Sequence, residues 1–214
     1  MGKKFAALEP IHHDFIQKQQ MFFVASATAE SRVNVSPKDG ASLRILDAQR
    51  VAYLDQTGSG NETAAHLRAD GRLTLMFCAL QGVPLILRLY GKGIVLARRS
   101  PAYAEMLASH FGNVEPPGAR QIVVLHVDLV QTSCGYGVPM FDFAGERATL
   151  RRWAEAKGDD GIAQYWQAKN VQSLDGLATG ILDGTDEDTA NEAEVENPAD
   201  ACVSRKPLEL NYEP

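Results

Sequence analysis

Short apolar runs, each closed by a turn signal, recur through the first two-thirds of this 214-residue chain. Runs of this kind are typical of β-strands. Strands are predicted at residues 21–27, 32–36, 43–46, 51–54, 73–80, 85–96 and 121–131, and helices at residues 11–20, 63–69 and 101–111. Short strands at regular spacing, with few helices between them, favour a barrel over an alternating parallel sheet. The pattern therefore predicts a mainly β, α+β fold built on a β-barrel.

Glycine and proline mark the places where the predicted strands bend or end. The run at residues 85–96 contains Gly91 and Gly93, which suggests a bulge or a barrel corner within one long strand. The sequence Pro-Lys-Asp-Gly at residues 37–40 is expected to end the strand before it. A serine and a proline at residues 100–101 predict a helix start, with the serine as the cap.

Three segments of different character follow one another along the chain. Residues 1–140 hold the predicted strands and are expected to form the barrel domain. Residues 141–182 read as a helical extension, with helices at 147–157 and 161–170. Residues 183–214 form a tail whose first part, up to residue 200, carries eight acids and no base. Such a tail is expected to be extended or disordered on its own.

The charge balance argues against a nucleic-acid partner. The chain carries a net charge of −6, but most of the acidity lies in the tail, and residues 1–182 have a formal charge of +2. Nucleic-acid binding normally needs a basic face. No apolar run approaches the roughly 20 residues of a membrane helix. The three cysteines are an odd set with wide spacing, which favours a reducing compartment, and we expect a cytoplasmic protein.

A glycine-rich loop, Thr-Gly-Ser-Gly-Asn-Glu-Thr at residues 57–63, lies between a strand-like run and a helix-like run. Ser59 and Glu62 have the spacing of a capping box, which predicts a helix start. A helix start carries unpaired N–H groups and partial positive charge, which suit a phosphate. The alternative interpretation is an ordinary capped loop without a ligand.

Two further features suggest ligand contacts. Arg88 interrupts an apolar strand, so its guanidinium must face solvent, pair with a carboxylate such as Asp55, or bind an anion. The alternating run at residues 32–38 places Asn34 and Ser36 on one strand face, followed by Lys38, and this face is suited to line a cofactor. The alternatives are a structural ion pair and a solvated sheet surface.

Other catalytic patterns are absent from the sequence. The five histidines lie apart or directly adjacent, and no CxxC or HExxH spacing occurs, so no metal site is expected. Cys134 has no activator next to it in sequence, and a plain loop thiol is the simpler interpretation. No residue is placed by spacing as a general acid or base, and the catalytic residues stay unknown.

Taken together, four stretches resemble the pyridoxamine 5'-phosphate oxidase-like family. They are Arg-Val-Asn-Val-Ser-Pro-Lys at 32–38, Val-Ala-Tyr-Leu-Asp-Gln-Thr-Gly-Ser-Gly-Asn-Glu-Thr at 51–63, Arg-Leu-Thr-Leu-Met-Phe-Cys at 72–78, and Leu-Arg-Leu-Tyr-Gly at 87–91. The resemblance spans about residues 10–135. It implies an FMN-binding split barrel, usually a homodimer with FMN at the subunit interface, and a phosphate held by early strands and the start of the inserted helix.

The same resemblance has specific departures. Asn61, Glu62 and Thr63 stand where the oxidases carry a Ser-Arg-Lys motif, so two basic residues are replaced. Either Glu62 turns inward to complete its capping box while N–H groups, Thr63, Ser36 and Lys38 hold the phosphate, or FMN binds weakly or not at all. Arg88 matches the arginine of the Val-Arg-x-x-Gly strand pattern. The sequence has no Arg-x-His element for a substrate phosphate, which argues against pyridoxamine phosphate as substrate.

The sequence therefore predicts an FMN-dependent oxidoreductase that works as a homodimer with a small-molecule electron donor and acceptor. The residues expected around the cofactor are Asn34, Ser36, Lys38, Thr57, Ser59, Asn61, Thr63 and Arg88. One alternative is a protein on the same fold that binds or senses a flavin, a haem or a deazaflavin without turnover. Another is an interaction module whose acidic tail and C-terminal helices recruit a partner.

Overall fold

The computed structural model describes residues 2–183, in which an antiparallel sheet of eight strands is flanked by helices. The strands are β1 (Lys3–Phe5), β2 (Met21–Ser26), β3 (Asn34–Asp39), β4 (Leu43–Asp47), β5 (Arg50–Gln56), β6 (Arg72–Cys78), β7 (Ile86–Ala97) and β8 (Ala119–Ser133). The helices are α1 (Pro10–Gln17), α2 (Glu62–Ala69), α3 (Pro101–His110) and α4 (Thr149–Lys169), with a 3-10 turn at Gly40–Ser42. The acidic tail predicted to be extended lies outside the described residues.

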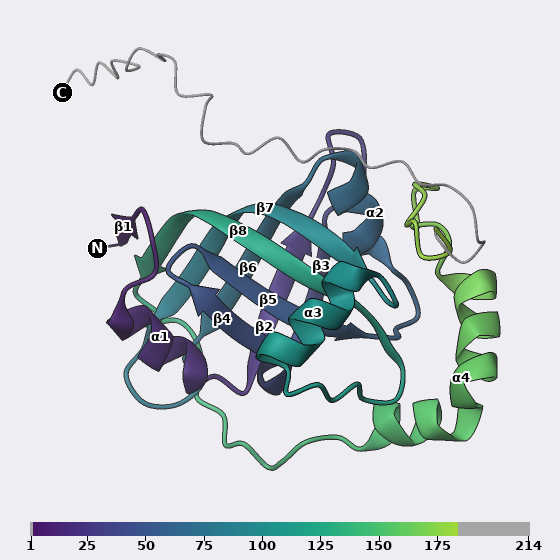
Figure 1. Ribbon diagram of the computed structural model, residues 1–214. Coiled ribbons are helices and arrows are strands. Elements are labelled where there is room, and N and C mark those ends of the chain that lie inside the picture. The colour runs from purple at the N-terminus through teal and green to yellow at the C-terminus, as the bar shows by residue number, and fades with distance from the viewer. Residues whose placement is uncertain (1, 184–214) are drawn as a thin grey trace. The chain divides into compact units, whose positions relative to one another are not determined.

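The strands follow the order β3-β2-β6-β7-β8-β5-β4, with β1 added on β8 (Figure 1). All neighbours are antiparallel, and the sheet curls into the half-closed arrangement of a split barrel. The predicted α+β split-barrel fold is therefore confirmed. β7 and β8 are the longest strands and pair along almost their whole length, so they form the backbone of the barrel.

Alternation along the strands builds the core. In β2 every second residue is buried, and Phe22 and Val24 are fully inaccessible to solvent. Phe22 packs against the rings of Tyr53 and Phe77 with centroid distances of 5.6 Å to each. Because one face of each strand is buried here, a shift of one residue would expose this set, and the hydrophobic pattern fixes the register.

The predicted bend at Gly91 is confirmed. The β7–β8 register shifts between Tyr90 and Gly91, which is a bulge in the long strand. A Cβ on Gly91 would lie 1.9 Å from the backbone oxygen of His126, so a side chain does not fit here. The glycine thus allows β7 to continue around the barrel while both of its halves stay paired with β8.

The expected strand break at Pro37 is wrong. β3 runs from Asn34 through Pro37 to Asp39, and Pro37 lies opposite Phe23 of β2. Proline is tolerated here because β3 is the edge strand of the sheet, so no further strand needs its missing N–H. The strand also begins at Asn34 rather than at Arg32.

The predicted cap of α3 is confirmed, since the Ser100 hydroxyl accepts a hydrogen bond from the Tyr103 amide at 3.1 Å. The two C-terminal helices predicted at 147–157 and 161–170 correspond to α4, which bends at Gly158, where φ is 65°. No helix among residues 2–183 is long and apolar enough to cross a membrane.

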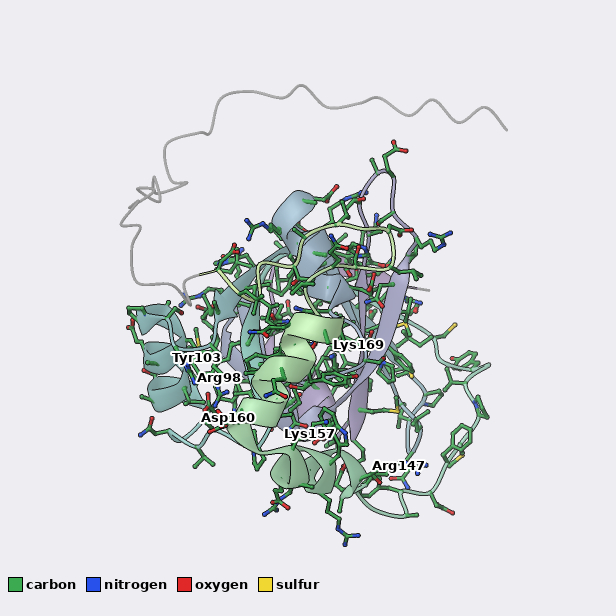
Figure 2. The ribbon with its side chains drawn as sticks, turned by 90° about the vertical axis from the view of Figure 1, so that its right-hand side faces the viewer. Arg98, Tyr103, Arg147, Lys157, Asp160 and Lys169 are labelled. Atoms are coloured by element: carbon green, nitrogen blue, oxygen red, sulfur yellow. The ribbon has the colours of Figure 1, made fainter. Side chains whose placement is uncertain are left out.

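α4 is attached to the barrel near α3 (Figure 2). The Arg98 guanidinium donates to both oxygens of Glu115, at 3.1 and 2.8 Å, and the Tyr103 hydroxyl donates to the same carboxylate at 2.6 Å. Arg98 also lies over the Trp166 ring of α4, 5.7 Å from its centroid. These contacts place the second half of α4, which contains Trp166, against the glycine-rich loop, where the site described next begins.

Candidate functional site

The interior face of the edge strand β3 presents a row of polar side chains. Asn34, Ser36 and Lys38 lie opposite the inward-facing residues of β2, so they point toward the inside of the barrel. The Asn34 Nδ2 donates to the Thr63 Oγ1 at 3.3 Å, and the Ser36 Oγ donates to the Asn34 Oδ1 at 3.2 Å. The structure thus brings Asn34, and through it Ser36, to the first turn of α2.

Lys38 continues this row into a buried ionic network. Its Nζ donates to the Asp55 Oδ1 at 2.5 Å, while the Arg120 Nη2 donates to the Asp55 Oδ2 at 2.7 Å. The Gln121 Nε2 reaches both the Asp55 Oδ2, at 2.9 Å, and the Asn61 Oδ1, at 2.8 Å. The network therefore joins β3, β5, β8 and the start of α2 at one point.

A bulge in β8 makes this convergence possible. Asp55 lies opposite Gln121, while the next residue of β5 lies opposite Ala119, so Arg120 is the extra residue of the ladder. Successive side chains of a regular strand point to opposite faces, but a bulge re-aims one of them. As a result, Arg120 and Gln121 both bind the same carboxylate although they are neighbours in sequence.

The network carries more positive than negative charge. Asp55, Lys38 and Arg120 are all mostly buried, and one carboxylate faces two cations. Burial by itself raises the pKa of Asp55, but the charges of Arg120 and Lys38 outweigh burial and hold that pKa well below its usual range. Since uncompensated buried charge is unfavourable, the network favours an additional anion near Lys38.

The glycine-rich loop is held from both sides. The Arg120 Nη1 donates to the Gly60 oxygen at 2.9 Å, and the Asn170 Nδ2 donates to the Gly58 oxygen at 3.2 Å. The Thr57 hydroxyl donates to the Gly118 oxygen at 2.9 Å and accepts from the Trp166 Nε1 at 2.8 Å. The loop is thus fixed by β8 and α4, and the Thr57 side chain is used in this anchoring.

Ser59 is exposed and makes no side-chain contact within the described residues. The predicted capping box of Ser59 and Glu62 is wrong. α2 begins at Glu62, its N-cap is Asn61, and no side chain caps the helix. The Glu62 carboxylate instead accepts hydrogen bonds from the Leu174 amide at 3.0 and 3.1 Å. A carboxylate at the first position of a helix cannot reach back as one at the third position does, and it bonds a neighbouring segment here.

Arg88 lies on the other face of the sheet from Lys38. Residues that pair across neighbouring strands lie on the same face of a sheet. Arg88 pairs with Met76, Met76 with Phe23, and Phe23 with Pro37, which faces outward. The Arg88 Nη1 donates to the Ser133 Oγ at 3.2 Å. The suggested pairing of Arg88 with Asp55 is therefore wrong, because Asp55 faces inward and pairs with Lys38 and Arg120.

Three buried polar atoms have no hydrogen-bond partner within residues 2–183, the Tyr53 hydroxyl, the Asn61 Nδ2 at the start of α2 and the His66 Nε2 in its last turn. The other ring nitrogen of His66 is bonded to the Ser26 hydroxyl at 3.0 Å. Buried polar groups are nearly always paired in folded proteins. The vicinity of the first turn of α2 therefore has capacity for a further hydrogen-bonding group.

Two cavities open beside this site, with volumes of about 1320 and 500 Å³. The larger is bounded by α1, the loop at 79–85 and the segment at 141–151. The smaller is bounded by the loop at 57–58 and by residues 111–116. Lys38 and Gln56 line both cavities, and Thr57 lines the smaller one as well.

Sequence reasoning missed Arg120, Gln121 and Asn170, although two signals were present. Arg120 and Gln121 are polar residues at the start of an otherwise apolar strand, and Asp55 is an acid near the end of another. An acid near the end of one strand and a base near the start of its antiparallel neighbour can lie side by side, which indicates an ion pair. Asn170 gave no comparable signal, because its role depends on where α4 ends against the loop.

Comparison with known proteins gives consistent matches. The sequence profile of the pyridoxamine 5'-phosphate oxidase family matches residues 8–134, which run from before α1 to the end of β8. Over 180 residues the chain is 38% identical to the pyridoxamine 5'-phosphate oxidase family protein ustO of Aspergillus flavus, covering 77% of this chain and 72% of that protein.

Solved structures to which this chain is similar include HupZ of Group A Streptococcus and the haem storage protein HutZ of Vibrio cholerae. HupZ superposes with a TM-score of 0.44 at 18% identity, covering 57% of this chain and 91% of that chain. HutZ gives a TM-score of 0.42 at 14% identity, covering 60% and 96%.

Proposed function

Because this chain belongs to the pyridoxamine 5'-phosphate oxidase family, we propose that it is a homodimeric, FMN-dependent oxidoreductase. The observation that carries the proposal is the polar row of Asn34, Ser36 and Lys38, which meets Thr63 in the first turn of α2. This row combines hydroxyl, amide and amine donors beside a helix start, which is the chemistry that a phosphate needs.

The residues present fit a phosphate group without the basic pair that Glu62 and Thr63 replace. The Thr63 hydroxyl and the unpaired Asn61 Nδ2 supply donors, and the first turn of α2 supplies N–H groups and partial positive charge. The Glu62 carboxylate is engaged by the Leu174 amide. The excess positive charge around Asp55 adds a favourable electrostatic environment.

When bound, FMN supplies the electron-transfer chemistry, and the protein supplies position and electrostatics. The Lys38 side chain lines both cavities, and its amine is held by Asp55. In the proposed enzyme Lys38 would supply positive charge and a hydrogen-bond donor to the bound cofactor. The larger cavity, of about 1320 Å³, has room for a small-molecule electron donor or acceptor.

A homodimer is supported by the outer face of the sheet. Val33 and Val35 are exposed to 72% and 58%, and Phe23, Met76 and Arg88 continue this face as half-buried residues. Large exposed apolar patches mark interaction sites. In the proposed dimer this face packs against its copy, and Arg88 lies on this face rather than beside the polar row of β3.

Cys78 and Cys134 are free thiols, which supports a reducing, cytoplasmic setting.

A cofactor-binding protein without turnover is the second candidate. The sequence contains no Arg-x-His element, and the resemblance associates that element with substrate phosphate. Such a protein would bind or sense a flavin, a haem or a deazaflavin on the same fold.

Absorption and mass spectra of the group that co-purifies with the protein test the proposal. A flavin spectrum with the mass of FMN, and a mass of two chains by light scattering, are expected. Thr63→Val is expected to weaken FMN binding about tenfold by removing one hydroxyl donor. Thr149→Val, the same change at an exposed site, is the matched control.

Anaerobic mixing with NADH or NADPH then separates the two candidates. Rapid bleaching of the bound flavin, followed by reoxidation with an acceptor, supports an oxidoreductase. A flavin that stays oxidised with both donors supports the binding protein. A colourless protein that gives no thermal shift with added FMN would contradict both flavin assignments.

A further inference from the structure

The segment that follows α4 folds back over the start of α2. We call residues 171–183 the cap segment. It forms a tight loop in which the Ser173 amide donates to the Leu177 oxygen at 2.8 Å, with Gly176 at a φ of 81°. Figure 1 shows it, in yellow-green, beside α2. Its place in the fold is close to the predicted phosphate end of the site.

Two contacts connect the tip of the cap segment to the site. The Leu174 amide donates to the Glu62 carboxylate at the first position of α2. The Asp175 carboxylate accepts from the Arg32 amide at 2.8 Å and pairs with the Arg32 guanidinium. The tip thus brings a second carboxylate to the side of α2 where Glu62 already lies.

The base of the cap segment is anchored by Asn170, which is completely buried. Its side chain accepts from Arg120 at 2.9 Å and donates to the Gly58 oxygen, and its backbone oxygen accepts from the Thr179 hydroxyl at 2.6 Å. The cap segment is therefore connected to the same network that holds the glycine-rich loop. Its base is fixed by Asn170, its tip contacts Glu62 and Arg32, and its end pairs through Asp183 with Arg68 of α2.

We propose that the cap segment restricts the cofactor to a flavin that ends at its phosphate, and that it excludes the dinucleotide FAD. This inference rests on the proposed function, because it takes the phosphate to lie at the first turn of α2. A dinucleotide continues past that phosphate with a second phosphate and an adenosine. The continuation would meet the cap segment and the carboxylate of Glu62, while the carboxylate of Asp175 is paired with Arg32 and ties the tip in place.

Exclusion of this kind works through repulsion and lost space rather than through a better fit to FMN. Like charges brought together at an interface are strongly unfavourable, and a site gains selectivity when it opposes the wrong ligand. Glu62 thereby acquires a role in a position where the resemblance expects a cation. Glu62 holds the cap segment closed and repels the second phosphate of a dinucleotide. The phosphate of FMN is held instead by the Thr63 hydroxyl and the N–H groups of the first turn of α2.

Binding of FMN and FAD to the apoprotein, measured by quenching of flavin fluorescence, tests this inference. The full-length protein is expected to prefer FMN over FAD by at least about a hundredfold. In the double variant Glu62→Gln with Asp175→Asn, the preference is expected to fall to about tenfold or less, mainly because FAD binds better. Asp47→Asn, which breaks an exposed pair with Arg50 elsewhere, is the matched control and is expected to keep the preference.

Hydrogen exchange gives a second readout that needs no catalysis. Amides of residues 171–181 are expected to exchange faster in the double variant than in the unaltered protein, and more slowly once FMN is added to the unaltered protein. Equal affinity for FMN and FAD in the unaltered protein, or an unchanged preference in the double variant, overturns the inference and leaves the proposed function standing. Binding of neither flavin overturns both.

Discussion

Two arginine–carboxylate contacts lie near the C-terminal part of the chain, one within the barrel and one between the barrel and the cap segment, and they differ in burial. In the network of Asp55 and Arg120, both side chains are about 4% exposed or less. In the pair of Arg32 and Asp175, the side chains are 73% and 16% exposed. The first contact lies beneath the glycine-rich loop, and the second lies at the tip of the cap segment. The buried contact of Asp55 with Arg120 therefore fixes the site, whereas the exposed contact of Asp175 with Arg32 can break and let the tip of the cap segment move.

Solvent explains this division. Water screens an exposed pair, and ordering two side chains costs entropy, so such pairs contribute little to stability. A buried pair is weak evidence for net stabilisation, but removing one partner leaves a charge without solvent or counterion, which is strongly unfavourable. The network at Asp55 is therefore sensitive to mutation, whereas the tip of the cap segment is free to respond to ligands.

The largest expected effect comes from Asp55→Asn, which leaves Lys38 and Arg120 together without a carboxylate. We expect a loss of about 3–5 kcal/mol in the free energy of unfolding, measured by urea denaturation. The control is Asp47→Asn, whose exposed pair with Arg50 is expected to matter by no more than about 0.5 kcal/mol. Equal losses in the two variants would remove the distinction between buried and exposed contacts.

Acid is expected to act on the same contact. The pKa of Asp55 is well below its usual range in the folded protein, so its stabilising contribution is complete above the unfolded value of about 4 and is lost as the pH falls below it. The urea midpoint of the unaltered protein should therefore decline from about pH 4 downward. In Asp55→Asn this decline should be shallower, and parallel curves for the two proteins would refute the assignment.

A smaller effect is expected for Trp166→Phe, which removes the indole N–H that binds Thr57. The lost hydrogen bond should lower the free energy of unfolding by about 1–2 kcal/mol and weaken FMN binding through a less ordered loop. Trp153→Phe, in the other half of α4, is the control and should leave FMN affinity unchanged. Thermal unfolding and flavin titration measure the two effects, and unaltered values in both would show that the indole contact does not order the loop.

The smallest effect on stability is expected for Asp175→Asn alone. Because its partner Arg32 is largely exposed, we expect the urea midpoint to stay within experimental error of the unaltered protein. The same variant should nevertheless increase hydrogen exchange at the tip of the cap segment. A clear loss of stability would mean that this pair is structural, like the network at Asp55.

The sequence predicted most of the fold because its main signals are local. The alternating strands, the bulge at Gly91 and the cap of α3 at Ser100 depend on neighbouring residues and are confirmed. The expected break at Pro37 failed because tolerance for proline depends on whether a strand lies at the edge of the sheet, and strand order is not a local property.

The site was less predictable for the same reason. Asn34, Ser36 and Thr63 meet as their spacing and the family resemblance suggested, but their role in binding FMN stays a prediction. The partner of Glu62 is Leu174, more than a hundred residues away, and no spacing rule reaches so far. Arg120 takes part only because a bulge turns its side chain, and such bulges are set by pairing across the sheet.

Pro37 has a consequence for how copies of the chain can associate. It stands in the middle of the edge strand β3 and interrupts the row of backbone donors along the rim of the sheet. A rim interrupted in this way is a poor template for a strand from another molecule, which guards against continuous growth of sheets into fibres. The proposed dimer through the broad side of the barrel would leave this rim free of contacts between copies.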